Sequence, residues 1–207
     1  MKKVSQYKNI YLNNLDFFAF TNTLLFLMMT IFVYSKRFIS YRGEANLYEF
    51  YFYAIVIFLT ISYTWLKFRH LQINRIILIL VEITILMHFS GAFIEVNGSR
   101  LYDFRLFDIR YDKFVHLINS MIGSFVAIYF FIKNDYKITR LTLCVIVLCV
   151  LGIGAIIEIL EFIVTLTVTH NGVGSYINNM SDLVANLIGS LIGITFYLIY
   201  ENNKRKR

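Results

Sequence analysis

The sequence predicts an all-α fold, a polytopic transmembrane bundle of about six helices that forms a single integral membrane domain over residues 1–207. Hydrophobic residues make up 58% of the chain and charged residues 16%, which is more apolar surface than a soluble domain of this size can bury. Apolar runs of about 20 residues recur along the chain, and a helix needs that length to cross a bilayer. Proline is absent, so no proline-rich linker divides the chain.

The apolar runs must be helical, because backbone groups cannot stay unpaired in lipid. The expected spans lie near residues 15–35, 47–66, 73–94, 111–132, 139–168 and 178–200. The basic start MKKVSQYK leads into a long apolar run without a small-residue cleavage site, so we expect a retained first helix and not a signal peptide. Cys144 and Cys149 lie in one apolar run and are expected to be packing residues.

The distribution of basic residues predicts the orientation. Most of the 20 Lys and Arg residues fall on one side of the membrane if both termini are cytoplasmic, as the positive-inside rule requires. The abundance of Ile, Asn, Lys, Phe and Tyr is typical of an AT-rich bacterial genome. We therefore expect a multi-pass protein of the bacterial cytoplasmic membrane, with N- and C-termini inside. The net charge of +7 then serves topology and contact with anionic headgroups, and we expect no nucleic-acid partner.

The loop EVNGSRLYDFRLFDIRYDK, residues 95–113, differs from the others because four acidic residues balance its four basic ones. It is expected on the external side. Two interpretations remain open: a solvated loop, or a lid or headgroup-contacting segment.

Polar and small residues form a stripe on each of the last four spans. Each stripe follows the spacing i, i+4, i+7, i+11, which keeps its members on one helix face. The stripes are Thr84, His88, Gly91 and Glu95; Asp112, His116, Asn119 and Gly123; Gly154, Glu158, Glu161 and Thr165; and Asp182, Asn186, Gly189 and Gly193. Their polar ends share one leaflet, the outer one in the expected orientation. The stripes predict four helices packed around a polar centre, with Gly152, Gly154, Gly189 and Gly193 at helix contacts.

Ionisable residues inside a span are costly and are functional candidates. The candidate catalytic residues are Asp112, His116, Glu158, Glu161, Asp182 and Asn186, and the candidate metal ligands are His88, Asp112, His116, Glu158, Glu161 and Asp182. Simpler interpretations stay open: Asp112 and Asp182 as helix-start residues, and both histidines as buried groups bonded to carbonyls. The carboxylates Glu158 and Glu161, one turn apart in an apolar run, need a proton, a cation or a base.

The segments YDKFVHLINSMIGSFVA, GIGAIIEILEF and NNMSDLVANLIGSLIG resemble the VanZ-like and YjdF-like bacterial membrane proteins. The shared features are Asp112, Lys113 and His116 at one helix start, Glu158 in the next helix, and the final pattern Asp182, Asn186, Gly189, Gly193. The resemblance covers roughly residues 80–200. VanZ-like chains often have Gln where Glu161 stands, which places this chain nearer the YjdF-like branch. The resemblance implies a cell-envelope protein, and VanZ-like members are associated with low-level resistance to a glycopeptide antibiotic.

Three functions remain open. The first is an outer-leaflet site that binds, and hydrolyses or modifies, a lipid-linked or phospholipid headgroup ligand, with a divalent metal ion as the possible cofactor. The second is a proton- or cation-coupled transporter. The third is a non-catalytic accessory or resistance protein. The expected partners are membrane lipids or a lipid-linked envelope intermediate, and the oligomeric state is open.

Overall fold

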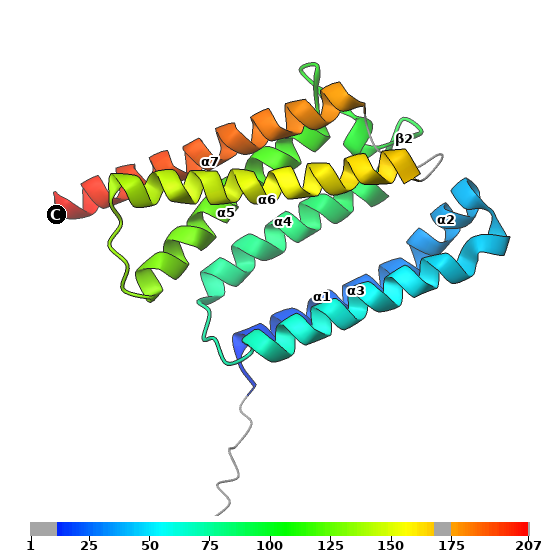
Figure 1. Ribbon diagram of the computed structural model, residues 1–207, viewed down its shortest axis with the longest axis horizontal. Coiled ribbons are helices and arrows are strands. Elements are labelled where there is room, and N and C mark those ends of the chain that lie inside the picture. The colour runs from blue at the N-terminus through cyan, green and yellow to red at the C-terminus, as the bar shows by residue number, and fades with distance from the viewer. Residues whose placement is uncertain (1–11, 168–174, 207) are drawn as a thin grey trace, which may run out of the picture. The chain divides into compact units, whose positions relative to one another are not determined.

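The computed structural model describes residues 12–167 and 175–206 (Figure 1). The predicted all-α class is confirmed. Within the described residues, five helical segments are long and apolar enough to cross a membrane: Asn14–Ser40, Glu44–Phe68, Tyr111–Lys133, Arg140–Leu166 and Tyr176–Arg205. Lys2, Lys3, Lys8 and Arg207, which contribute to the predicted orientation, lie outside the described residues. The chain forms two compact units, Met1–Leu78 and Ile79–Arg207, and the single-domain organisation stays a prediction.

The first unit is a helical hairpin. Helix α1 (Asn14–Met29) continues through a π-helical turn, Thr30–Tyr34, into α2 (Ser35–Arg42). Gly43, with φ of 81°, ends α2, since glycine adopts such angles without steric cost. A 3₁₀ turn, Glu44–Asn46, then leads into α3 (Leu47–Phe68). The predicted span 15–35 is therefore longer than the sequence indicated.

Asp16 joins the start of α1 to the end of α3. Its carboxylate accepts hydrogen bonds from Trp65 Nε1 at 2.9 Å and from Arg69 Nη2 at 3.5 Å. It also completes a capping box with Asn13, whose side-chain amide donates to the Arg69 carbonyl at 2.7 Å. Asp16 is buried, and the sequence analysis assigned it no role.

The second unit contains α5 (Tyr111–Lys133), α6 (Arg140–Thr167) and α7 (Tyr176–Arg205), together with most of α4 (Arg75–Phe93). Helices α5 and α7 pack against each other along most of their length, and α6 contacts both (Figure 1). A Cβ at Gly189 would collide with the Leu117 carbonyl of α5, and one at Gly193 would lie 2.7 Å from the Met121 carbonyl oxygen. The predicted packing role of these two glycines is confirmed.

The face of α6 that meets its neighbours differs in part from the prediction. Gly154 lies against the Asn186 side chain of α7, as expected, whereas a Cβ at Gly152 would have nothing within 4 Å. Cys144 and Cys149 are both exposed. The expected packing roles of Gly152 and of the two cysteines are therefore wrong. Gly152 and Cys144 lie on open sides of α6, and Cys149 faces the cavity described below.

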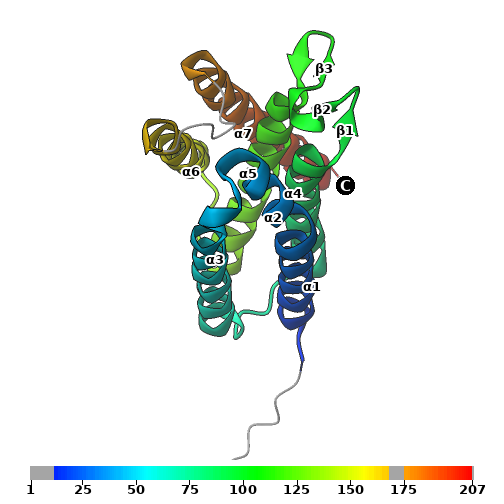
Figure 2. The ribbon, with the colours of Figure 1, turned by 90° about the vertical axis from the view of Figure 1, so that its right-hand side faces the viewer.

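The segment between α4 and α5 forms two antiparallel β-hairpins in tandem, here called the double hairpin, residues 94–110 (Figure 2). The first pairs β1 (Glu95–Val96) with β2 (Ser99–Arg100). A 3₁₀ turn, Leu101–Asp103, follows, and then β3 (Arg105–Leu106) pairs with β4 (Ile109–Arg110). Glu95 thus lies in a strand and not on α4, so its predicted place on the α4 stripe is wrong.

The two hairpins repeat the same ten-residue geometry. Both turn residues have positive φ, Asn97 and Gly98 in the first hairpin and Phe107 and Asp108 in the second, as in type I′ turns. The amide of Leu101 donates to the Ile94 carbonyl at 2.7 Å, and that of Tyr111 donates to the Phe104 carbonyl at 2.8 Å. Each hairpin therefore ends in an equivalent arginine, Arg100 or Arg110.

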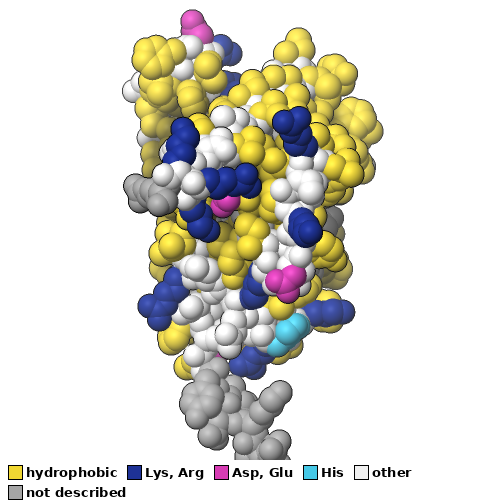
Figure 3. All heavy atoms as spheres, turned by 90° about the vertical axis from the view of Figure 1, so that its left-hand side faces the viewer, with side chains coloured by type: hydrophobic (Ala, Val, Ile, Leu, Met, Phe, Trp, Pro, Cys, Tyr) yellow, Lys and Arg dark blue, Asp and Glu magenta, His cyan; other side chains and the backbone are white. Residues whose placement is uncertain are grey.

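The other end of the second unit is apolar inside and basic at its tip. Ile128, Leu143, Ile146, Val150 and Ile194 form a buried apolar cluster between α5, α6 and α7. Beyond it, the last turns of α5 and α7 carry Lys133, Lys204 and Arg205. Figure 3, a view from this side that includes side chains of both units, shows more Lys and Arg side chains than acidic ones. This is the side predicted to be cytoplasmic, and the orientation stays a prediction.

Candidate functional site

The first turns of α5 and α7 bring a polar cluster together, and Lys113 lies at its centre. The Lys113 ammonium donates to Asp182 Oδ1 at 2.6 Å, to Asn178 Oδ1 at 2.8 Å and to the Asn178 carbonyl at 3.1 Å. It also lies 3.3 Å from Asp112 Oδ2. The Asn178 side-chain amide donates to Asp182 Oδ2 at 3.0 Å. Asp182 is 1% exposed, so solvent cannot balance its charge, and the Lys113 ammonium does so instead.

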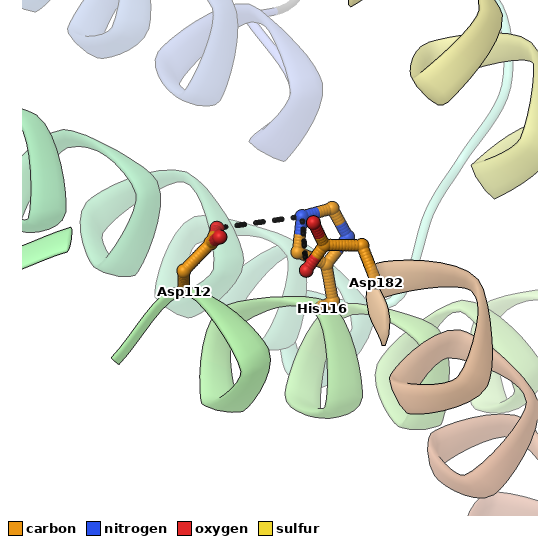
Figure 4. Close-up of side chains that lie close together, drawn as sticks. All are labelled: Asp112, His116 and Asp182. Atoms are coloured by element: carbon orange, nitrogen blue, oxygen red, sulfur yellow. Dashed lines mark ion pairs between the residues drawn. The ribbon is translucent and has the colours of Figure 1, made fainter. Parts of the chain in front are cut away.

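His116 lies between carboxylates of three helices. Its Nε2 is 3.6 Å from Asp112 Oδ1 and 3.6 Å from Asp182 Oδ1 (Figure 4). Its Nδ1 is 3.7 Å from Glu158 Oε1. These separations are too long for hydrogen bonds. Separations of this size are compatible with nitrogen and oxygen atoms that ligate one metal ion.

Asp112, His116 and Asp182 could hold a metal ion. One ligand atom from each lies within 4.8 Å of the others, and carboxylate and imidazole ligands suit several divalent cations. Among the described residues, no other group of His, Cys, Asp and Glu has this geometry. Of the other ligands predicted from the sequence, Glu158 approaches the group through His116, whereas Glu161 and His88 line the cavity beside it.

Glu158 is the most unusual side chain of the cluster. It is 4% exposed, and neither carboxylate oxygen has a hydrogen-bond partner within the described part of the chain. A buried carboxylate without donors is costly. Its position therefore requires a proton, a cation or a donor from a ligand.

Asn186 lies one turn further into α7. Its Oδ1 accepts a hydrogen bond from Ser120 Oγ of α5 at 2.8 Å. Its Nδ2 is in contact with Gly154 and has no hydrogen-bond acceptor among the described residues. The absence of a side chain at Gly154 gives the amide its space, so the stripes of α5, α6 and α7 meet here.

His88 of α4 contacts the double hairpin. The Tyr102 hydroxyl lies 2.6 Å from His88 Nδ1 and 2.9 Å from the His88 carbonyl oxygen. The Tyr102 ring also covers Gly91, where a Cβ would be 2.7 Å from it. His88 is thus held by the hairpin segment and lies at the edge of the site.

A cavity of about 650 Å³ runs from the double hairpin to the apolar cluster. One end is polar and the other is apolar. The polar end is lined by His88, Arg100, Tyr102, Arg110, Asp112, His116, Glu161, Asn178 and Asn186. The apolar floor is lined by Gly123, Val126, Ala127, Cys149, Val150, Ile153 and Ile157.

The structure adds residues that the sequence analysis did not place in the site. Lys113 was noted only as part of a motif, and Arg100, Arg110, Asn178 and Ser120 were not considered. Arg110 Nη1 donates to Asn178 Oδ1 at 2.6 Å and so links the double hairpin to the cluster. The repeated arginine of the loop was the signal that could have identified it.

Comparison with known proteins gives a family but no described relative. No curated protein and no solved structure matches the chain. The family model described as "Predicted membrane protein (DUF2238)" matches residues 20–203, a range that includes the double hairpin and every residue of the polar cluster. The chain therefore belongs to the predicted membrane protein family DUF2238.

Proposed function

We propose that this protein is a VanZ-like or YjdF-like protein of the bacterial cell envelope that binds a lipid or a lipid-linked ligand. The headgroup lies against the polar cluster of α5, α6 and α7, and the chain of the ligand lies along the apolar floor. In the predicted orientation, the headgroup is in the outer leaflet.

The proposal rests on one observation, the change from a polar to an apolar lining along a single cavity. The cavity has charged and amide side chains at one end and only apolar residues and glycine at the other. Its volume of about 650 Å³ is within the range of small-molecule sites. A wholly polar solute would leave the apolar floor unfilled, and a wholly apolar one would leave the charged and amide side chains of the polar end without partners. An amphiphile satisfies both ends.

The motifs support the family assignment within the proposal. Lys113 and His116 of the first motif both lie close to Asp182 of the final motif, and Glu158 approaches the same histidine. Three motifs that are separate in the sequence thus form one cluster, as expected if they share a function.

The test places a larger side chain on the apolar floor of the cavity, at a position on α6. Ile153 lines the cavity and Ile156, on the same helix, does not. The two side chains are similarly exposed, 63% and 59%, so Ile156 is a matched control. The protein is purified in detergent, and binding of dioleoylphosphatidylglycerol is followed by native mass spectrometry. We expect one lipid to be retained per chain, with occupancy reduced at least fivefold in Ile153→Trp and unchanged in the matched control Ile156→Trp. Equal occupancy in the two variants would contradict the proposal.

A metal-assisted hydrolase is the second candidate, favoured by the Asp112–His116–Asp182 geometry. A divalent ion held there would activate water against a headgroup ester. Metal content is measured by mass spectrometry in the wild type and in a variant with Asp112, Glu158 and Asp182 changed to Ala. We expect near-stoichiometric metal in the wild type and its loss in a variant that is still helical by circular dichroism. Absence of metal from the wild type would exclude this candidate and leave the binding function intact.

A further inference from the structure

The double hairpin brings two arginines to a single carboxylate at the mouth of the cavity. Arg100 Nε lies 3.0 Å from Asp103 Oδ2, and Arg110 Nη2 lies 2.8 Å from Asp103 Oδ1. Both arginines line the cavity. The ten-residue repeat generates this arrangement, because it places an arginine at the same position of each hairpin, on either side of Asp103.

One of the hydrogen-bond donors of Arg110 has no acceptor among the described residues. Its Nη2 is used by Asp103 and its Nη1 by the neutral Asn178 side chain. Its Nε is buried and has no acceptor among the described residues. A buried donor without an acceptor is costly, so a guanidinium that lines the cavity favours an acceptor supplied by a ligand.

The chemistry of the pair favours phosphate. Arginine binds phosphate oxygens through paired N–H donors in a planar fork. Asp103 is 38% exposed, so solvent screens its ion pairs and an incoming anion can compete with them. The carboxylates of Asp112 and Asp182 lie deeper and repel an anion, so the phosphate stays at the mouth.

The second hairpin also suits a lipid ligand. Its turn exposes Leu106, Phe107 and Ile109, with Phe107 89% exposed. Exposed aromatic and aliphatic side chains next to arginines are typical of segments that lie at the membrane interface. The arginine pair is therefore well placed to meet a headgroup.

We propose that Arg100 and Arg110 form a phosphate-binding pair and that the ligand of the cavity is a lipid carrying a phosphate group. This inference rests on the proposed lipid-binding function and names the class of ligand.

The experiment compares two lipids that differ only in the phosphate. Dioleoylphosphatidic acid and dioleoylglycerol are titrated into the wild-type protein in dodecylmaltoside micelles and followed by native mass spectrometry. We expect phosphatidic acid to bind at least tenfold more tightly. Arg110→Gln and Arg100→Gln are each expected to remove most of this preference, and Arg110→Lys to keep part of it, because a lysine retains the charge but loses the fork.

Arg105→Gln is the matched control. Arg105 is an exposed arginine of the same double hairpin, hydrogen-bonded to the Asp108 carbonyl at 3.4 Å, and it does not line the cavity. It is expected to leave the preference unchanged. If Arg110→Gln fails to fold, Arg100→Gln carries the test.

The outcomes separate the two proposals. Equal binding of both lipids to the wild type, or an equal loss in Arg105→Gln and Arg100→Gln, would overturn the phosphate inference and leave lipid binding standing. Absence of saturable binding of either lipid would instead contradict the proposed function itself.

Discussion

At the residue scale, Lys113 decides whether the acids of α5 and α7 can share one site. Its ammonium contacts Asp182 and Asp112 together, so two carboxylates that would otherwise repel each other lie around one cation. The stripe analysis identified Asp112, His116 and Asp182 because they follow a helical spacing. It did not identify Lys113, which lies off the predicted stripe of α5 and reaches the cluster through its long side chain. Asn178 lies four residues before Asp182, on the same face of α7, so the stripe of α7 begins one turn earlier than predicted.

Replacing Lys113 by Met tests this balance. The change leaves Asp182 buried without its ammonium partner, and breaking such a pair costs about 3 kcal/mol. We expect a lower midpoint of thermal unfolding in detergent, followed by circular dichroism. Lys137→Met, at an exposed lysine, is the control and is expected to change nothing. The double variant Lys113→Met with Asp182→Asn is expected to recover part of the loss. An unchanged midpoint in Lys113→Met would rule out the ion pair as a stabilising contact.

At the element scale, glycine positions explain how closely α5 and α7 approach. The sequence predicted this contact, because small residues at helical spacing are typical of close packing in membranes. It did not predict which sides of α6 are open. Lipid-facing and protein-facing residues of a membrane helix are both apolar. The sequence therefore could not indicate that Cys144, Cys149 and Gly152 are exposed.

The double hairpin shows a second limit at this scale. The Asn97–Gly98 pair is a recognised hairpin signal, but Phe107–Asp108 is not. The second hairpin is recognised only from its similarity to the first. The sequence analysis treated residues 95–113 as one loop and did not divide it into ten-residue units.

Two glycine substitutions separate packing from helix propensity. Gly189→Ala places a methyl group against the Leu117 carbonyl, and such overpacking costs about 1–3 kcal/mol. Gly152→Ala meets no atom within 4 Å, so only the higher helix propensity of alanine remains, a gain of at most about 1 kcal/mol. We expect the unfolding midpoints, measured in the same detergent, to move in opposite directions. A fall of similar size in both variants would mean that α5 and α7 do not approach as described.

At the scale of the whole molecule, the sequence predicted the fold class and the membrane location well. Both depend on long apolar runs, and an apolar run has one stable form in lipid. The sequence did not predict the division into two units, because uniformly apolar helix surfaces do not indicate which neighbours they contact. The buried Asp16, which joins α1 to α3 within the first unit, shows that specific contacts depend on single polar residues.

Cysteine labelling tests the predicted orientation. Single cysteines replace Ser99 in the double hairpin and Asn203 near the end of α7, both exposed, in a chain with Cys144 and Cys149 changed to Ala. A membrane-impermeant maleimide is added to intact spheroplasts. We expect Ser99→Cys to be labelled and Asn203→Cys to react only after lysis, because the basic end of α7 should be cytoplasmic. The reverse pattern would place the polar cluster in the inner leaflet.

The apolar cluster beyond the cavity floor also has an electrical consequence. Val150 lines the floor and packs with Ile128, Ile146 and Ile194, so the cavity ends against a low-dielectric layer. Voltage across a membrane falls mainly over such layers, where a full crossing is worth about 2.3 kcal/mol per charge at 100 mV. Asp112 and Asp182 lie on the polar side of this apolar layer, so we expect them to sense little of the field. Ligand binding at the cluster is therefore expected to be nearly independent of membrane potential, which suits a lipid headgroup better than a voltage-driven ion.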